Sequence, residues 1–174
     1  LATVLAKLSN FIPEGGIWMN TQRPEWNDAN NALVGNGVSM VTLYYLRRFL
    51  IFFDKQITDT EHERVELSNE LIVFFKKIQS TFEDNKHLLQ DSINDAQRRE
   101  IMDSLGQAGS DYREHIYKQA FWGVKRTVSY RRLRSFLKLS LKFIEHTIKA
   151  NKRKDKLYHA YNLMTVENDK EVSI

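Results

Sequence analysis

Hydrophobic side chains recur every three or four positions along most of the chain, a spacing that predicts helices with one apolar face. The clearest stripe lies in 130–150, and a second lies in a helix expected to begin near 58–60 and to run to about residue 89. Thr60 and Glu63 have the spacing of a capping box at its start. The apolar positions are Leu133, Phe136, Leu137, Leu141, Ile144 and Ile148 in the first stripe, and Leu71, Phe74, Phe75, Ile78 and Phe82 in the second.

The segment 29–53 is apolar on nearly every side, which is typical of a helix that is buried or crosses a membrane. A spanning helix needs about 20 mostly apolar residues, and here Asn36 and the pair Arg47-Arg48 interrupt the run. We therefore interpret 29–53 as a buried helix and expect no membrane partner. The small residues Gly35-Asn36-Gly37 would lie inside this helix, where they suit a close contact between helices.

Weaker apolar patterns also favour helix. Residues 2–10 have the pattern of the last turns of a helix, and 91–105 and 111–123 predict two more, with Gly106 and Gly109 as a break or kink between them. The chain holds only 2 prolines and 7 glycines, so little interrupts these segments. The predicted fold is therefore all-α, built of helical hairpins, with residues 1–174 as a single domain.

Composition and charge change this picture only slightly. The absence of cysteine excludes a disulfide scaffold, a thiolate zinc site and a cysteine nucleophile. The 5 histidines lack the His-Glu-x-x-His spacing of a zinc site, so we expect neither a metal nor a cofactor. A formal net charge of +4 favours anionic partners only weakly. Because the chain begins at Leu1 rather than Met, we interpret it as a fragment of a larger protein.

The candidate chemistry lies in 11–31, the longest stretch without a regular pattern. It holds both prolines, the pair Gly15-Gly16 and two of the three tryptophans. A loop longer than about 12–15 residues in a compact domain is usually functional or disordered, and aromatic side chains argue against disorder. Trp rings offer a flat apolar face to a sugar, and polar side chains bind its hydroxyls. The predicted sugar-binding residues here are Trp18, Asn20, Gln22, Arg23, Glu25, Trp26, Asn27 and Asn31.

Asp28 is the predicted catalytic residue of this loop. A carboxylic acid among aromatic side chains loses solvation, so its pKa rises and it can act as a general acid. Glu25 is a second acid nearby, and Glu14 is more remote. The other interpretation is structural, because Asp and Asn are favoured N-caps and Asn27 and Asp28 directly precede a predicted helix. The two roles are compatible, since one residue can cap while the other faces a cleft.

The segment Pro24-Glu25-Trp26-Asn27-Asp28-Ala29-Asn30-Asn31 resembles the Trp-Asn-Asp motif of the six-hairpin, (α/α)6-toroid glycosidases and sugar phosphorylases. The resemblance implies that Asp28 protonates the departing glycosidic oxygen and that Trp26 lines a sugar subsite. It also implies that 29–53 is an inner helix of an α/α toroid. Such a ring needs twelve helices, and this chain predicts five or six, so it would be a fragment. No residue is identifiable as the second catalytic group, and the isolated chain is expected to be inactive.

His159, within Tyr158-His159-Ala160-Tyr161-Asn162, resembles part of a second sugar-binding loop, although a packed aromatic turn is an equal interpretation. The leading hypothesis is a portion of a carbohydrate-active domain whose partners are a carbohydrate and the rest of the parent chain. An incomplete ring would expose apolar helix faces, so we also expect a homo-oligomer. The alternatives are a non-catalytic helical interaction bundle and a basic nucleic-acid-binding domain, the latter less favoured because a solvated face explains the basic residues of 131–156.

Overall fold

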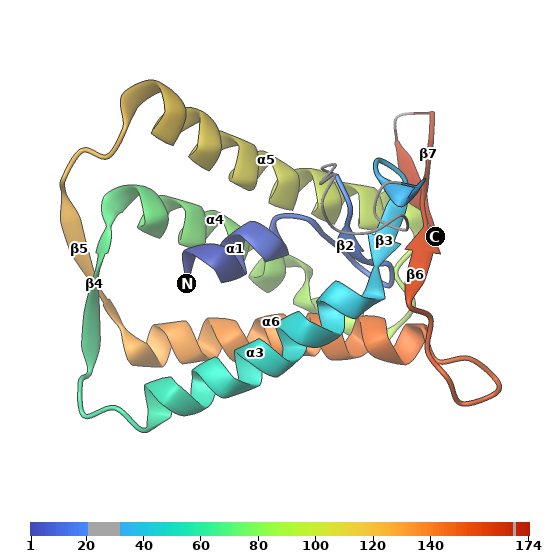
Figure 1. The fold of residues 1–174 in the computed structure, drawn as a ribbon, viewed down its shortest axis with the longest axis horizontal. Helices are drawn as coiled ribbons and strands as arrows, with labels where there is room; N and C mark the ends of the chain where they lie inside the picture. Colours follow the sequence, from blue (N-terminus) through green and yellow to red (C-terminus); the bar gives the residue numbers. More distant parts are fainter. Residues whose placement is uncertain (21–31, 169) are drawn as a thin grey trace.

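Helices form the body of the molecule in the computed structural model, which describes residues 1–20, 32–168 and 170–174. One helix pair, α3 with α6, lies opposite another, α4 with α5, and the short helix α1 lies between the pairs (Figure 1). The helices are α1 (Ala2–Leu8), α3 (Met40–Thr58), α4 (Asn69–Asn85), α5 (Asp95–Gln119) and α6 (Tyr130–Ala150), with a 3-10 turn η1 (Lys86–Gln90) after α4.

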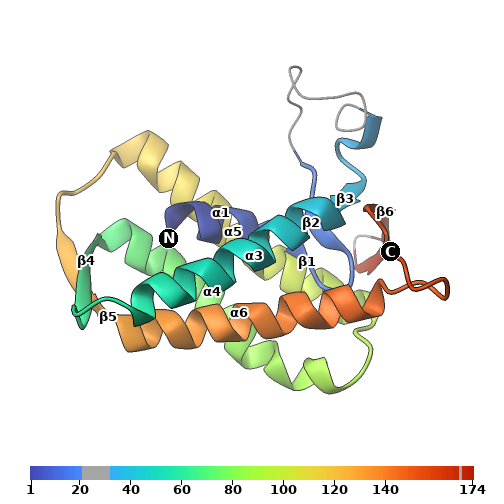
Figure 2. The same ribbon diagram turned by 60° about the horizontal axis from the view of Figure 1, so that its bottom comes forward.

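Short antiparallel strands connect these helices at both ends of the molecule. A sheet of order β1-β2-β3-β6 lies at one end, with the hairpin β7-β8 beside it, and the ribbon β4-β5 lies at the other end (Figures 1 and 2). The strands are β1 (Phe11–Ile12), β2 (Gly16–Trp18), β3 (Gly37–Ser39), β4 (Arg64–Ser68), β5 (Lys125–Ser129), β6 (Tyr161–Leu163), β7 (Thr165–Glu167) and β8 (Glu171–Ser173).

The all-α prediction is wrong, and with it the prediction of helical hairpins from an α/α toroid. The described residues are 59% helical and 18% strand, and their strands form three small antiparallel sheets. Each strand has only two to five residues, too few for a clear alternation of apolar and polar positions. Two of the pairings also join remote segments, since Gly37 pairs with Leu163 and Arg64 with Ser129. A local pattern carries no information about such pairings.

Helix α3 begins at Met40 and not at residue 29, so the predicted bounds of the first long helix are wrong. Gly35 has a φ of +94°, which a right-handed helix does not allow, and Gly37 begins strand β3. The side chain of Ser39 caps α3 by accepting the backbone N–H of Thr42 at 3.0 Å. The predicted part of this helix at 29–31 lies outside the described residues.

Helix α3 is also not buried on all sides. Leu43, Leu46 and Leu50 lie in the core, whereas the side chain of Tyr45 is 68% exposed and that of Phe52 is 55% exposed. The apolar run therefore serves two purposes: one face packs against the core, and the opposite face remains open to solvent.

The starts of α4 and α5 differ from those predicted as well. The capping box at Thr60 and Glu63 does not start a helix, because Arg64–Ser68 forms strand β4 and Ser68 caps α4 instead. Helix α5 begins after Asn94, whose side chain accepts from the backbone of Gln97 in a capping box. It then continues unbroken to Gln119, through both glycines that were expected to interrupt it.

Helix α6 has the predicted bounds, so the prediction of a helix over 130–150 is confirmed. Its apolar face packs on α4, where the Phe75 and Phe136 rings meet edge-on with centroids 5.0 Å apart. The Phe82 and Phe143 rings lie closer, at 4.6 Å. These aromatic contacts, together with buried Leu5 of α1, make up the centre of the core between the helix pairs.

A polar network ties the turn between β1 and β2 to the helices behind it. Glu14 accepts hydrogen bonds from Arg98 at 2.9 Å and from the backbone N–H of Ile93 at 3.1 Å. It also contacts the ring of His146 at 3.1 Å. Arg98 is 6% exposed and also donates to the carbonyl of Val172 in β8. Because both carboxylate oxygens of Glu14 have partners, this acid has a structural role and does not face a cleft.

Candidate functional site

Three of the predicted site residues, Trp18, Asn20 and His159, belong to the part of the chain that the structure describes. The other seven lie outside the described residues, so their predicted roles stay predictions. These are Gln22, Arg23, Glu25, Trp26, Asn27, Asn31 and the predicted catalytic residue Asp28.

Trp18 ends strand β2, where it lies opposite Val38 of β3. Its indole N–H donates to the carbonyl oxygen of Gly35 at 2.8 Å, which fixes the orientation of the ring. The ring is half-buried and packs against a small apolar cluster that includes Met164. Next to it, the side-chain amide of Asn20 donates to the amide oxygen of Asn10 at 2.6 Å.

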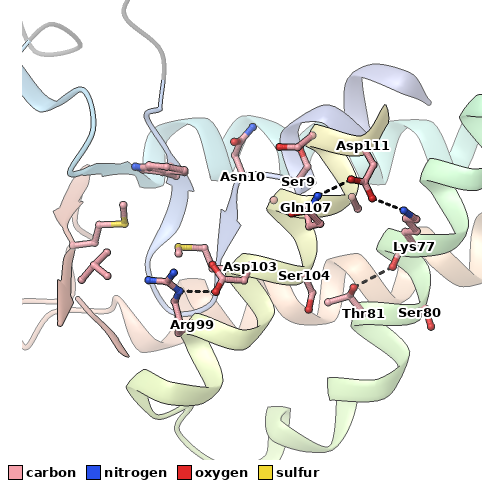
Figure 3. Close-up of a pocket in the computed structure, with 17 residues that line it drawn as sticks. Ser9, Asn10, Lys77, Ser80, Thr81, Arg99, Asp103, Ser104, Gln107 and Asp111 are labelled. Carbon is pink, nitrogen blue, oxygen red and sulfur yellow. Dashed lines mark hydrogen bonds and ion pairs between the residues drawn. The ribbon is translucent and has the colours of Figure 1, made fainter. Parts of the chain in front are cut away.

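Trp18 and Asn10 both line a cleft of about 1010 Å³ (Figure 3). One wall of the cleft is a face of α5, and the facing wall includes residues of α4. The polar side chains that line it are Ser9, Asn10, Lys77, Ser80, Thr81, Arg99, Asp103, Ser104, Gln107, Ser110 and Asp111, and the apolar ones are Trp18, Met102, Ala108, Met164 and Val166.

The charged groups of the cleft are paired with one another (Figure 3). Arg99 donates to Asp103 at 2.6 Å, and Lys77 donates to Asp111 at 2.5 Å. Gln107 also donates to Asp111, at 2.6 Å. The hydrogen bonds from Lys77 and then from Gln107 hold the pKa of Asp111 below its ordinary value, so this carboxyl is ionised at neutral pH. The cleft therefore offers fixed hydrogen-bond acceptors and donors, and Asp111 serves there as an ionised acceptor.

His159 does not line this cleft. It precedes β6 and lies near the start of α3, where its carbonyl oxygen accepts from the Tyr44 hydroxyl at 3.3 Å. The ring of Tyr158 meets that of Tyr44 edge-on, with centroids 6.2 Å apart. Of the three described site residues, Trp18 lines the cleft, Asn20 is hydrogen-bonded to the cleft residue Asn10, and His159 lies outside the cleft in an exposed turn.

The cleft residues that come from α4 and α5 were not among the predicted site residues. A signal for some of them is present, because Arg99, Asp103, Gln107 and Asp111 follow each other at four-residue spacing and so share one face of a helix. Such a row is typical of a solvated face, and nothing in it predicts that Lys77 of α4 lies opposite.

Two further observations bear on the class of site. Within the described ranges, no group of three or more His, Cys, Asp or Glu side chains lies close enough together to hold a metal ion. None of the helices described is both long and apolar enough to cross a membrane. Comparisons with models of known protein families and with curated proteins found no match to this chain.

Proposed function

We propose that this chain is the sugar-binding portion of a carbohydrate-active protein, of the hydrolase or phosphorylase kind that residues 24–31 resemble. One observation carries the proposal: Trp18, predicted from the sequence to contact sugar, lines a large cleft together with many polar side chains of α4 and α5. An aromatic face can pack on the C–H groups of a pyranose while amides, hydroxyls and charged groups bind its hydroxyls.

The position of Asn20 supports a connection between the cleft and the Trp-Asn-Asp motif. Asn20 directly precedes 21–31, and its side chain is hydrogen-bonded to Asn10, which lines the cleft. The chain therefore enters the motif-bearing segment from the edge of the cleft. In this proposal Asp28 is the general acid, and the ion-paired Asp103 and Asp111 bind sugar hydroxyls.

A binding experiment tests the role of Trp18. Titration of the chain with cellobiose and with N,N′-diacetylchitobiose, followed by calorimetry, should show binding of at least one disaccharide. Trp18→Ala should weaken that binding roughly tenfold, which is about 1.4 kcal/mol, because it removes the flat apolar face on which the sugar packs. Trp18→Phe should retain most of the affinity, since a flat ring remains.

Tyr117 supplies a matched control, because this aromatic residue of α5 is 83% exposed and does not line the cleft. Tyr117→Ala should leave sugar binding unchanged. Equal binding by Trp18→Ala and the parent chain, with both folded by circular dichroism, would contradict the proposed platform.

Asp28→Asn tests the proposed general acid in the longer parent protein, assayed for glycoside hydrolysis and phosphorolysis. We expect turnover to fall by a factor of about 10²–10⁴, the contribution typical of a positioned proton donor. The melting temperature should change little. A drop in melting temperature with unchanged turnover would instead assign Asp28 a structural role, as in the N-cap interpretation of the sequence.

A second candidate function, an interaction module without catalysis, is favoured by the exposed aromatic side chains of α3. Tyr45, Phe49 and Phe52 lie at the spacing of one helix face, and each is at least 46% exposed. Apolar side chains gathered in this way mark a surface for another protein or another part of the parent chain.

The nucleic-acid alternative has less support. Arg132 of α6 donates to the Gln79 side chain at 2.9 Å, and Arg134 forms an ion pair with Asp54 at 2.9 Å. These two cations of the basic helix are therefore engaged within the chain and are less available to phosphates.

A further inference from the structure

A second cavity, of about 340 Å³, lies between the first turns of α4 and the last turns of α5. The Phe74 and Tyr112 rings on its wall are stacked, with centroids 4.8 Å apart and an angle of 16° between their planes. The ring of His115 meets that of Trp122 edge-on, also at 4.8 Å. Glu70 is the buried acidic residue among these aromatic side chains.

Glu70 lines this cavity and has one buried carboxylate oxygen without a partner. The residue is only 5% exposed, and its Oε1 accepts the backbone N–H of Trp122 at 3.0 Å. Its Oε2 is buried and accepts no hydrogen bond from any described residue. The hydrogen bond from Trp122 holds the pKa of Glu70 below its ordinary value of 4.5, so the side chain is ionised at neutral pH.

No cation among the described residues forms an ion pair with Glu70. Lys77 is the lysine on the wall of this cavity, and its ammonium binds Asp111 at 2.5 Å instead. A buried carboxylate without a positive partner is costly, and native structures usually supply that partner from the chain, from solvent or from a ligand.

His115 provides a second unpartnered atom on the same wall. Its Nε2 is buried and has no hydrogen-bond partner in the described part of the chain. A neutral imidazole that carries its proton on Nδ1 exposes a lone pair at Nε2. In that tautomer, Glu70 Oε2 and His115 Nε2 are two buried acceptors without a donor, on two residues that line one cavity.

We propose that this cavity binds a primary alkylammonium group, which donates N–H bonds to Glu70 Oε2 and His115 Nε2. A primary ammonium carries three donors and one positive charge, so it can satisfy both acceptors and neutralise the carboxylate. The aromatic walls add to the fit, since a cation is attracted to the face of a Trp or Tyr ring within about 6 Å. The alkyl part of the ligand would pack on Phe74 and Val73.

The chemistry of the cavity favours an organic cation over the other ligand classes. A metal ion needs more ligands, and the described residues offer no group of three metal-binding side chains. A neutral alcohol or a water molecule can donate to the two acceptors but leaves the charge of Glu70 uncompensated. The inference does not rest on the proposed sugar function, although the two cavities share Lys77 and Asp111.

The test compares two probes of equal size, n-butylammonium and 1-butanol, by ¹H–¹⁵N chemical-shift titration of the chain. We expect n-butylammonium to bind with a dissociation constant on the order of 1 mM, as suits a ligand of so few atoms. Binding of 1-butanol should be at least tenfold weaker. The ring nitrogens of His115 should shift on addition of the amine, a readout that requires no variant.

Glu70→Gln should weaken n-butylammonium binding at least tenfold, because it removes the charge but keeps an oxygen for the Trp122 N–H. The matched control is Glu66→Gln, an exposed acid of neighbouring β4 that should leave binding unchanged. If Glu70→Gln does not fold, the His115→Phe variant and the comparison of the two probes still test the proposal. Equal binding of amine and alcohol, or no shift at His115, would overturn the proposal and assign the two acceptors to a buried water.

Discussion

Glu14 and Glu70 are both largely buried acids, and the difference between them lies in how many of their oxygens have partners. Glu14 accepts hydrogen bonds at both oxygens and anchors the β1-β2 turn to the helices. Glu70 has a donor at Oε1 only. Satisfied networks of this kind make a fold rigid, whereas an incompletely satisfied carboxylate is available to a ligand.

Glu70 should also make stability depend on pH at the acid end. The pKa of Glu70 is lower in the folded chain than in the unfolded chain. Its ionised carboxylate therefore stabilises the fold at pH values above 4.5, the ordinary pKa of the group. The contribution is lost as pH falls toward the folded pKa, because the unfolded chain then binds the proton first. Urea unfolding at about pH 7 and about pH 3 should show a smaller acid-induced loss for Glu70→Gln than for the parent chain.

Glu66→Gln serves as the comparison for this measurement, since Glu66 is exposed on β4. It should keep the acid-induced loss of the parent chain. Asp111, whose pKa is also lowered, will keep part of the pH dependence in every variant. An unchanged pH dependence in Glu70→Gln would contradict a lowered pKa at this position.

Gly106 and Gly109 of α5 look alike in the sequence, but their surroundings differ. An added Cβ at Gly106 meets no atom within 4 Å. An added Cβ at Gly109 would lie 2.8 Å from the Cβ of Ser9, which follows α1. Only Gly109 is therefore required for the close approach of the two helices.

Alanine at each glycine should change stability in opposite directions. Gly106→Ala should stabilise the chain by about 0.5–1 kcal/mol, because alanine costs less backbone entropy in a helix. Gly109→Ala should destabilise it by about 1–3 kcal/mol, because the contact with Ser9 forces α1 and α5 apart. Urea unfolding of the two variants measures both values, and a stabilising Gly109→Ala would show that the close contact does not form.

Which elements could be predicted depends on whether their signal is local. The bounds of α6 follow from a one-sided stripe such as Leu133, Leu137 and Ile144, together with Ser129 as its N-cap. Strand β3 offers no such signal, because buried Val38 continues the apolar run of α3 and its partner Asn162 is distant in sequence. The same limit applies to the cleft. Trp18 was predicted as a sugar-binding residue, but that it lines a cleft together with residues of α5 follows only from tertiary packing.

In the whole molecule, the helix pairs α3–α6 and α4–α5 bury α1 between them, and all three of its core residues are fully enclosed. This arrangement turns one face of α3 outward. Phe49 packs against Phe53 with ring centroids 5.9 Å apart, and both Phe49 and Phe52 remain open to solvent. The exposed row on α3 is therefore a feature of the packing and not of a frayed helix end.

Self-association is the expected consequence of this exposed row. Sedimentation velocity over a range of concentrations should show a dimer or larger species for the isolated chain, because association removes the aromatic side chains from water. The double variant Phe49→Glu with Phe52→Glu should shift the chain toward monomer, since it places two like charges in the contact. Tyr117→Glu, which changes an exposed aromatic residue of α5 in the same way, should leave the distribution unchanged. A monomer at every concentration would contradict this prediction and show that α3 does not bind a second copy.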